Sequence, residues 1–378
     1  MKKVLIICYS PLHRDPRVLT QIDALKNNYK VICAGYTDPK IDGVEFHNLI
    51  MPKRNFVEKL AKPFLILLRQ TNTVYWSEAS IRNYNVLSDL NYVDVVISNE
   101  LNILLLGLKL KDKYKSKLIL DAHEYYPGIE LGKGLKYLIN KLYHHQVIAK
   151  YFKKADMITT IGEGIRDLYK KNFKIDSEVV MNLPAFINQE ISENKGKIKI
   201  VHHGNAMPKR KLERMIEMMR YLKDNYSLTF YLMVHDKYQK YFKQLKQKAN
   251  TINKEIYFNE AVPTNEIPYE LNKYDIGLYI LPPTSLNNKF ALPNKLFEFI
   301  QARLAVAIGP SPEMKRIVQK YSVGIVSHKF TSKSMADEIM KIDRDDIKKF
   351  KENSNKTAKV LNSGELKKMW LNLVSDLL

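Results

Sequence analysis

The chain of 378 residues has few of the features that mark a secreted or membrane-spanning protein. It contains two cysteines, Cys8 and Cys33, each inside a short apolar run typical of a buried strand. This cysteine usage excludes a disulfide scaffold and favours a reducing compartment. No apolar run approaches the roughly 20 residues of a membrane span, and the run from Val4 to Cys8 is too short for a signal peptide. We therefore expect a cytoplasmic protein, either soluble or peripheral on the inner face of the cell membrane.

Acidic residues are also scarce relative to basic ones. Lys and Arg number 61, Asp and Glu number 40, and the formal net charge is +21. Such an excess favours an anionic partner, for example a nucleotide, a phosphate group or an acidic membrane. The basic residues are spread along the chain, and they lack the interleaving with aromatic residues of a known nucleic-acid-binding module. Nucleic acid is therefore not expected as a partner.

Short β-branched runs alternate with segments of helical period through the first half. The runs are 4–7, 30–33, 93–97, 118–120 and 157–161, and 17–26 is one of the helical segments between them. Their hydrophobicity is continuous rather than alternating, which indicates parallel strands with both sheet faces covered by helices. This pattern predicts a doubly wound α/β domain.

The same pattern restarts after a polar stretch near residues 182–196. Strands are predicted at 197–201, 228–234, 256–258, 276–280, 305–308 and 324–326, with a helix at 212–222. We therefore expect two Rossmann-like domains, 1–182 and 183–364, with a C-terminal helix, 365–378, packing back on the first. Ligands of such sheets bind at the carboxyl ends of the strands, so a cleft between the domains is the expected active site.

The segment from Leu292 to Ala302 is the most informative of the chain. Pro293 and Asn294 fit the first turn of a helix, where free N–H groups and the helix dipole favour a phosphate. Lys295 adds a positive charge there, and Glu298 lies on the same helix face three residues later. A carboxylate can accept hydrogen bonds from a ribose diol, so this combination suits a sugar nucleotide. The alternative is an amphipathic surface helix with an ion pair.

A second candidate phosphate site follows the strand near residues 198–202. Gly204 and Asn205 continue from the strand, and Arg210 and Lys211 precede the next helix. Glycine allows the backbone to approach a ligand, and an arginine presents a planar fork to diphosphate oxygens. Cations at the start of a helix are unfavourable because they oppose the positive end of the helix dipole. Their presence here therefore indicates that an anion binds at this point.

The order and spacing of these motifs resemble those of retaining glycosyltransferases with the GT-B fold, in particular family 4-like enzymes of bacterial surface-polysaccharide synthesis. The resemblance covers nearly the whole chain. It rests on four motifs, which are Val4–Ser10 with Asp15-Pro16-Arg17-Val18, Asp121-Ala122-His123-Glu124-Tyr125-Tyr126-Pro127, His203-Gly204-Asn205 with Lys209-Arg210, and Pro293–Phe299 leading to Ala305-Val306.

The resemblance implies a metal-independent, hexosyltransferase-like enzyme that moves a sugar from a nucleotide-diphosphate sugar to a glycan or lipid-linked hydroxyl acceptor. No cofactor is implied, because the nucleotide sugar is the donor substrate. Donor contacts are expected from the residues of the two phosphate motifs, and catalytic contacts from His123, with Glu124 as a clamp on the acceptor. The loop with His13, Arg14, Asp15 and Arg17 is expected to meet the acceptor or the diphosphate. From the residues alone, His123 could equally be a buried histidine bonded to Asp121 or Glu124.

The chain departs from the family pattern at three places. Phe290 stands eight residues before Glu298, where many relatives have a second glutamate, and Lys211 stands where many have glycine. The first loop also lacks a glycine-rich turn. The first departure leaves the donor sugar open and motivates one alternative, a non-catalytic GT-B subunit. A sugar-nucleotide epimerase on the same fold is a separate alternative, which would bind the donor but need no acceptor groove.

Two further segments of the sequence each have two possible interpretations. The acidic residues Asp343–Asp346 precede a helix and no strand, so capping explains them better than a metal site. The segment Lys53–Arg69 is both basic and apolar, which suits either an anionic membrane surface or a helix packed on the sheet. Pro63 is expected to break this segment.

Overall fold

The computed structural model describes residues 1–53, 55–129 and 134–378. The chain divides into two compact units, each built around its own parallel sheet. Unit 1 comprises residues 1–181 and 365–378, and unit 2 comprises residues 182–364. The predicted fold class, two doubly wound α/β domains, is confirmed. The expected cleft between them stays a prediction.

The sheet of unit 1 has, among the described residues, seven strands in the order β3-β2-β1-β4-β5-β6-β7. Adjacent strands are parallel throughout, as in the pairing of Val4 with Val31 on one side and Val95 on the other. The strands are β1 (Lys3–Cys8), β2 (Lys30–Gly35), β3 (Glu45–Asn48), β4 (Val95–Asn99), β5 (Lys117–Ala122), β6 (Met157–Thr160) and β7 (Glu178–Val179). The order reverses at β1, so a ligand crevice is expected at the carboxyl ends of β1 and β4.

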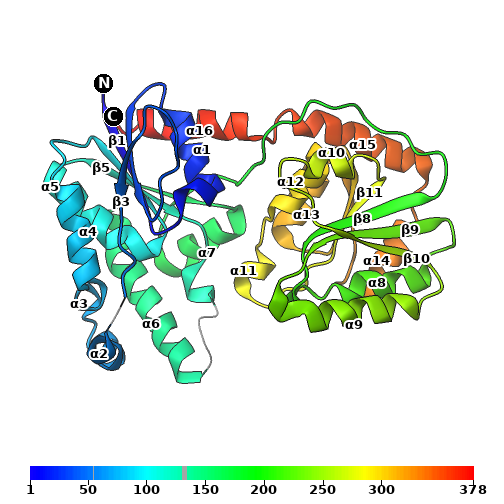
Figure 1. The fold of residues 1–378 in the computed structure, drawn as a ribbon, viewed down its shortest axis with the longest axis horizontal. Helices are drawn as coiled ribbons and strands as arrows, with labels where there is room; N and C mark the ends of the chain where they lie inside the picture. The colour runs from blue at the N-terminus through cyan, green and yellow to red at the C-terminus, as the bar shows by residue number, and fades with distance from the viewer. Residues whose placement is uncertain (54, 130–133) are drawn as a thin grey trace. The chain divides into compact units, whose positions relative to one another are not determined.

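The helices of unit 1 come from both ends of the chain. They are α1 (Pro16–Leu25), α2 (Phe56–Leu67), α3 (Thr71–Tyr75), α4 (Glu78–Ser88), α5 (Leu104–Tyr114), α6 (Gly134–Tyr151), α7 (Glu163–Phe173) and α16 (Ser363–Ser375). Helix α16 lies beside α1 (Figure 1), where Lys367 pairs with Asp23 and Trp370 is fully buried. Helix α2 continues through Pro63, so the predicted break is wrong. An Asn55–Glu58 capping box begins this helix.

Unit 2 repeats the architecture with six strands in the order β10-β9-β8-β11-β12-β13. The strands are β8 (Ile198–Asn205), β9 (Tyr226–Met233), β10 (Glu255–Glu260), β11 (Ile276–Tyr279), β12 (Ala305–Ile308) and β13 (Gly324–Val326). The helices are α8 (Glu213–Met218), α9 (Gln239–Asn250), α10 (Ile267–Leu271), α11 (Leu286–Lys289), α12 (Asn294–Gln301), α13 (Pro312–Tyr321), α14 (Ser332–Ile339) and α15 (Arg344–Ala358). Helices cover both faces of this sheet (Figure 1). The strand order reverses at β8, so a ligand crevice is expected at the carboxyl ends of β8 and β11.

Candidate functional site

The glycine at the end of β8 is adapted to a close contact with a lysine from α12. Gly204 has a φ of +128°, a conformation that favours glycine. A Cβ atom at this position would lie 2.5 Å from both Cε and Nζ of Lys295. The missing side chain therefore leaves the space in which the ammonium group rests on the backbone of the β8 loop.

Two cations converge on Tyr279, at the end of the neighbouring strand β11. Arg210 donates from Nη1 to the Tyr279 hydroxyl over 3.1 Å, and Lys295 Nζ lies 5.7 Å from the centroid of the same ring. Burial and, to a smaller extent, repulsion from Arg210 lower the pKa of Lys295 to about 8, although Glu298 opposes the shift. Like charges held this close are stabilised when an anion binds between them.

Glu298 lies one helical turn beyond Lys295 and is almost enclosed. Burial raises the pKa of its carboxyl group, and Lys295 counteracts this only in part. His203 Nε2 approaches Glu298 Oε2 to 3.2 Å. Burial and the nearby Lys295 hold the pKa of His203 well below its usual range, so the imidazole is neutral.

Three buried polar atoms around the end of β8 lack a hydrogen-bond partner among the described residues. They are Nε2 of His202, Oδ1 of Asn205 and Nε2 of His203, whose 3.2 Å contact with Glu298 does not have the geometry of a hydrogen bond. The other ring nitrogen of His202 contacts the carbonyl oxygen of Leu278 at 2.8 Å, and burial lowers the pKa of this histidine to about 3. Buried polar groups are normally paired, so three orphans in one place indicate room for a polar ligand.

Two other predicted donor residues lie at the margin of this cluster. Asn294 is the first residue of α12, and its side-chain oxygen accepts from Asn182 Nδ2 over 3.1 Å. Lys211 is exposed and has a φ of +52° directly after the short 3-10 helix Pro208–Arg210. A left-handed residue at this point means that the backbone of position 211 would also suit glycine.

His123, in unit 1, is clamped between two carboxylates at the carboxyl edge of the sheet. Its Nδ1 lies 3.0 Å from Glu100 Oε1, and its Nε2 lies 3.1 Å from Asp121 Oδ2. Burial alone would lower the pKa of His123, but Asp121 and then Glu100 raise it to about 9. The ring is therefore a fixed cation at neutral pH, and both nitrogens are occupied as donors. Asp121 is a partner as expected, whereas Glu100 takes the place considered for Glu124.

Glu100 was not singled out in the sequence, although it follows strand β4 directly. Its φ of +80° and ψ of 154° lie in a region that is almost confined to glycine and costs on the order of 1–3 kcal/mol. Its Oε2 accepts from the Tyr126 hydroxyl over 2.5 Å, and its backbone N–H donates to the Asp121 carbonyl. These bonds hold the strained residue against His123.

Arg17 does not lie in a ligand-facing loop, which corrects its predicted placement. It belongs to α1, its side chain is 5% exposed, and its guanidinium binds Asp121 at 2.5 and 2.6 Å and the Val180 carbonyl at 2.9 Å. Burial would raise the pKa of Asp121, but the Arg17 charge and then His123 hold it well below its usual range. Arg17 therefore neutralises a buried carboxylate that also holds His123.

The other predicted residues of this loop have different surroundings. Asp15 caps α1 by accepting from the Val18 N–H, and it also accepts from Ser10 Oγ over 2.7 Å. His13 and Arg14 are exposed, and His13 Nδ1 lies 2.6 Å from Thr37 Oγ1. His13 and Arg14 thus remain accessible to a ligand, while Asp15 shapes the loop.

Glu124 lies at the surface immediately after His123. Desolvation by neighbouring atoms, and then the Glu100 carboxylate, raise the pKa of Glu124. Its backbone carbonyl accepts from the Tyr169 hydroxyl over 2.7 Å. A carboxyl group with a raised pKa beside a charged imidazole can exchange hydrogen bonds with a hydroxyl group of a ligand.

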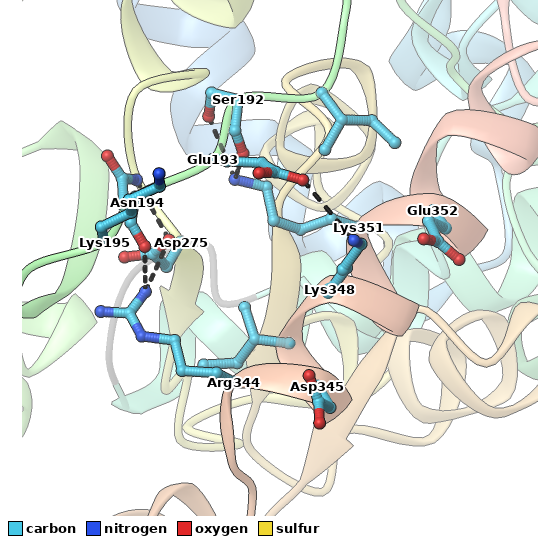
Figure 2. A pocket seen from close by; sticks show the side chains of 12 residues that line it. Ser192, Glu193, Asn194, Lys195, Asp275, Arg344, Asp345, Lys348, Lys351 and Glu352 are labelled. Carbon is cyan, nitrogen blue, oxygen red and sulfur yellow. Dashed lines mark hydrogen bonds and ion pairs between the residues drawn. The ribbon is translucent and has the colours of Figure 1, made fainter.

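Unit 2 also has a cavity of about 250 Å³ at the opposite edge of its sheet, before β8 and β11. Figure 2 shows that its cations Arg344, Lys348 and Lys351 bind Asp275 or the chain segment 191–196. Lys351 donates to the carbonyl oxygens of Ser192 and Tyr274, and Arg344 lies 3.6 Å from Asp275. We therefore assign this cavity an anchoring role, because these three cations are already paired and ligands of parallel sheets bind at the other edge.

In the part of the chain that the structure describes, no group of three His, Cys, Asp or Glu side chains could hold a metal ion. Asp343 instead begins α15 through a capping box with Asp346, as predicted. No helix of the described ranges is both long and apolar enough to cross a membrane.

Comparison with known proteins supports the assignment of unit 2. Residues 185–360 match the family described as Glycosyl transferases group 1. Unit 2 is therefore similar to the domains of this glycosyltransferase family. The region matched contains Gly204, Arg210, Lys295 and Glu298, together with the orphaned polar atoms around β8. No curated protein matches the chain significantly.

Solved structures show the fold of the whole chain. The structure of HepE from Anabaena in complex with UDP has a TM-score of 0.73, at 11% identity and with 100% of both chains covered. A UDP-forming α,α-trehalose-phosphate synthase from Burkholderia vietnamiensis has a TM-score of 0.69 at 10% identity, covering 100% of this chain and 99% of its own. A glycosyltransferase from Rickettsia africae has a TM-score of 0.68 at 12% identity, with 100% and 98% covered. This chain therefore has the GT-B fold.

Proposed function

We propose that the protein is a glycosyltransferase that uses a nucleotide-diphosphate sugar as its donor. The observation that carries the proposal is the convergence of Arg210 and Lys295 on Tyr279, with Lys295 against Gly204 at the end of β8 and Glu298 one turn further along α12. The family match of unit 2 supports it, as does the HepE structure in complex with UDP-glucose. The epimerase and the non-catalytic subunit have no comparable support.

In this proposal each donor residue has a definite role. Arg210, Lys295 and the first N–H groups of α12 bind the diphosphate, and the backbone at Gly204 and Asn205 approaches it. Glu298 accepts hydrogen bonds from the ribose diol. The leaving diphosphate gains negative charge as the glycosidic bond breaks, and the preorganised cations stabilise that charge without a metal ion. Asn294 and Lys211 act at the edge of this site.

We further propose that the sugar is a hexose and that it is transferred with retention to a hydroxyl group. His123 cannot serve as a general base, because both of its nitrogens donate to carboxylates. It contributes a fixed positive charge and a rigid surface for the sugar, while Glu124 contacts the acceptor. The leaving diphosphate itself receives the proton of the acceptor hydroxyl.

The direct test is calorimetric titration with UDP, uridine and UDP-glucose in the presence of a chelator. Glu298→Gln is expected to weaken UDP binding by about 1.5–3 kcal/mol, the range for hydrogen bonds to a charged group. Glu352→Gln is a matched control, because this residue lies on α15 at the anchoring cavity. Unchanged UDP affinity in Glu298→Gln would refute the donor assignment. Product analysis with and without an acceptor then separates transfer from epimerisation, and a chain that never consumes the donor would be a non-catalytic subunit.

The acceptor is proposed to be a glycan or lipid-linked glycan of bacterial surface-polysaccharide synthesis, reached from the cytoplasmic face of the membrane. Helix α2 supports this, because most of its apolar side chains are not used in the core and only Ile66 is buried. The exposed ones, which we call the α2 face, include Phe56 (73% exposed), Val57, Leu60, Phe64 (65% exposed), Leu67 and Leu68. The alternative of a helix packed on the sheet is thus disfavoured.

Basic residues border the α2 face. Lys53, Lys59, Lys62 and Arg69 lie on or beside the helix, and Arg54 lies outside the described residues. Each basic residue near an anionic surface contributes about 1 kcal/mol, and buried apolar side chains add to this. We therefore propose that the α2 face rests on an anionic bilayer.

Co-sedimentation with anionic and neutral vesicles tests this part separately. Wild type is expected to bind anionic vesicles at low salt, and Phe56→Ser/Phe64→Ser and Lys53→Ser/Lys59→Ser are expected to bind less. Lys237→Ser/Lys240→Ser is a matched control, because it removes the same charge from the surface of unit 2. If wild type does not bind anionic vesicles, or if all variants sediment like wild type, the α2 face does not dock on a bilayer and the proposal of a membrane-bound acceptor loses its support.

A further inference from the structure

A cavity of about 300 Å³ in unit 1 is lined mostly by residues that the sequence did not single out. It lies where several strands of the sheet end, since Tyr9 and Tyr36 directly follow β1 and β2 and Asn102 lies in the turn after β4. Tyr75 from α3 and Tyr143 from α6 also line it. Its volume is at the lower end of the range for ligand sites and suits one small polar ring rather than a long chain.

The aromatic walls are held in place before any ligand binds. Tyr9 and Tyr36 stack with their ring centroids 6.0 Å apart and an interplanar angle of 14°. The Tyr9 hydroxyl accepts from Asn83 Nδ2 over 3.3 Å, and the Tyr75 hydroxyl accepts from the Leu106 N–H over 3.3 Å. Rigid aromatic faces beside hydroxyl and amide groups suit a sugar ring, which has apolar C–H faces and a polar rim.

The charge of the cavity favours an anionic substituent on that ring. Lys62 donates to Asn140 Oδ1 over 2.9 Å and lies 5.6 Å from the centroid of Tyr143. Burial lowers the pKa of His144, which therefore stays neutral, and its Nδ1 lies 2.9 Å from the Tyr126 carbonyl oxygen. Among the described lining residues none is Asp or Glu, so a lysine is the charged group of the wall.

The cavity shares a wall with the His123 cluster. Tyr126 meets the cavity residue His144 through its carbonyl, and through its hydroxyl it meets Glu100. Leu101, which lines the cavity, directly follows the strained Glu100, and its N–H donates to the Tyr126 hydroxyl over 3.0 Å. A ligand that fills the cavity therefore lies next to the residues that hold His123.

We propose that this cavity binds the acceptor through a sugar ring that carries a phosphate, with the tyrosines against the ring and Lys62 on the phosphate. The proposal rests on the proposed transferase function and adds the chemical class of the acceptor. The same chemistry occurs in a free sugar phosphate and in a lipid-linked glycosyl phosphate. Lys62 belongs to α2, so an alkyl chain attached to the phosphate would begin beside this helix.

Methyl-labelled methionine provides a local probe of the cavity. Met51 lines it, whereas Met233 and Met340 are exposed in unit 2 and serve as internal controls. With saturating UDP in the donor site, hexose 1-phosphates of glucose, galactose and mannose are titrated alongside the free hexoses and inorganic phosphate. At least one hexose 1-phosphate is expected to shift the Met51 signal at concentrations where the free hexoses and phosphate do not. Met233 and Met340 should stay unchanged.

Two lysines of the same helix separate a cavity contact from a general charge effect. Lys62→Ala is expected to weaken hexose 1-phosphate binding about tenfold or more, and Lys59→Ala, outside the cavity, to leave it unchanged. A dodecyl ester of the same glycosyl phosphate distinguishes the two sources. Tighter binding of the ester that is lost in Phe64→Ser indicates a lipid-linked acceptor, and equal binding indicates a free sugar phosphate.

Three outcomes would overturn the proposal. One is a Met51 signal that no hexose 1-phosphate moves, another is equal binding by Lys62→Ala and wild type, and the third is a response to phosphate alone. None of these outcomes depends on the donor site. If the donor-site assignment is wrong, the protein will not bind UDP in the calorimetric titration. The failure of the cavity and the failure of the transferase assignment are therefore separable.

Discussion

Replacing Gly204 with alanine tests whether the glycine exists to make room for a phosphate-binding lysine. The new Cβ would lie 2.5 Å from Cε and Nζ of Lys295, so the ammonium group must leave its place on the β8 loop. The loss of one charge-assisted contact corresponds to about 1.5–3 kcal/mol, or a roughly ten- to hundredfold weaker UDP affinity. The φ of +128° adds a cost to folding on the order of 1–3 kcal/mol.

Calorimetry with UDP and with uridine distinguishes these two effects, and thermal unfolding reports the second. Gly204→Ala is expected to lose UDP affinity while uridine affinity changes little, because the contact concerns the diphosphate. In a Lys295→Ala background the alanine at position 204 should cost little further affinity, since the group that it displaces is already gone. The reasoning would be refuted if folded Gly204→Ala bound UDP like wild type, or if the two losses were fully additive.

Three further predictions concern charge and strain. Because the pKa of Lys295 is lowered to about 8, the charge of this lysine is lost as the pH rises through this value. UDP affinity measured by calorimetry should therefore fall between pH 7 and 9.5 in wild type but stay level in Lys295→Arg. The same dependence of UDP affinity on pH in both proteins would contradict the assignment. Lys211→Gly should raise the free energy of unfolding by up to about 1 kcal/mol in denaturant titration, because it removes a left-handed lysine, and a loss of stability would show that the lysine side chain matters more than its backbone. Arg17→Met should lower the free energy of unfolding by about 3–5 kcal/mol at pH 7, since Asp121 is left buried without its partner. The pKa of Asp121 is depressed in the folded wild type, so its stabilising contribution is present at neutral pH and is lost on acidification; the difference between Arg17→Met and wild type should therefore shrink at low pH, and a constant difference would indicate lost packing instead.

Local patterns were sufficient to predict most of the fold. The continuous apolar run at Val4 became β1, and Pro293 with Asn294 began α12 where the turn chemistry placed them. The capping role of Asp343 was equally local, because it depends on a residue three positions away. The two-residue strand β7 was missed, since a pair of residues carries no periodicity.

The surroundings of the candidate site depended on contacts between distant residues, which spacing alone does not contain. Arg17 and Asp121 are 104 positions apart, so a basic residue near a loop could not be distinguished from one enclosed beside a carboxylate. Nothing in the sequence distinguishes Glu100 from an ordinary surface glutamate. Its positive φ and its bonds to His123 and Tyr126 arise only in the folded structure. The cavity lined by Tyr9, Tyr36, Tyr75 and Tyr143 combines strand ends and helices that are far apart in the sequence.

The return of α16 to unit 1 determines the order in which the protein matures during synthesis. Leu366, Trp370 and Val374 are buried against a domain whose other residues end at Met181, while unit 2 is one continuous segment inserted between them. Ribosomes add about 5–20 residues per second and domains fold as units, so unit 2 emerges whole while unit 1 still lacks its last helix. The domain that begins at the N-terminus is thus the last to be completed, and a nascent chain stalled before residue 365 would expose the surface that Trp370 later covers.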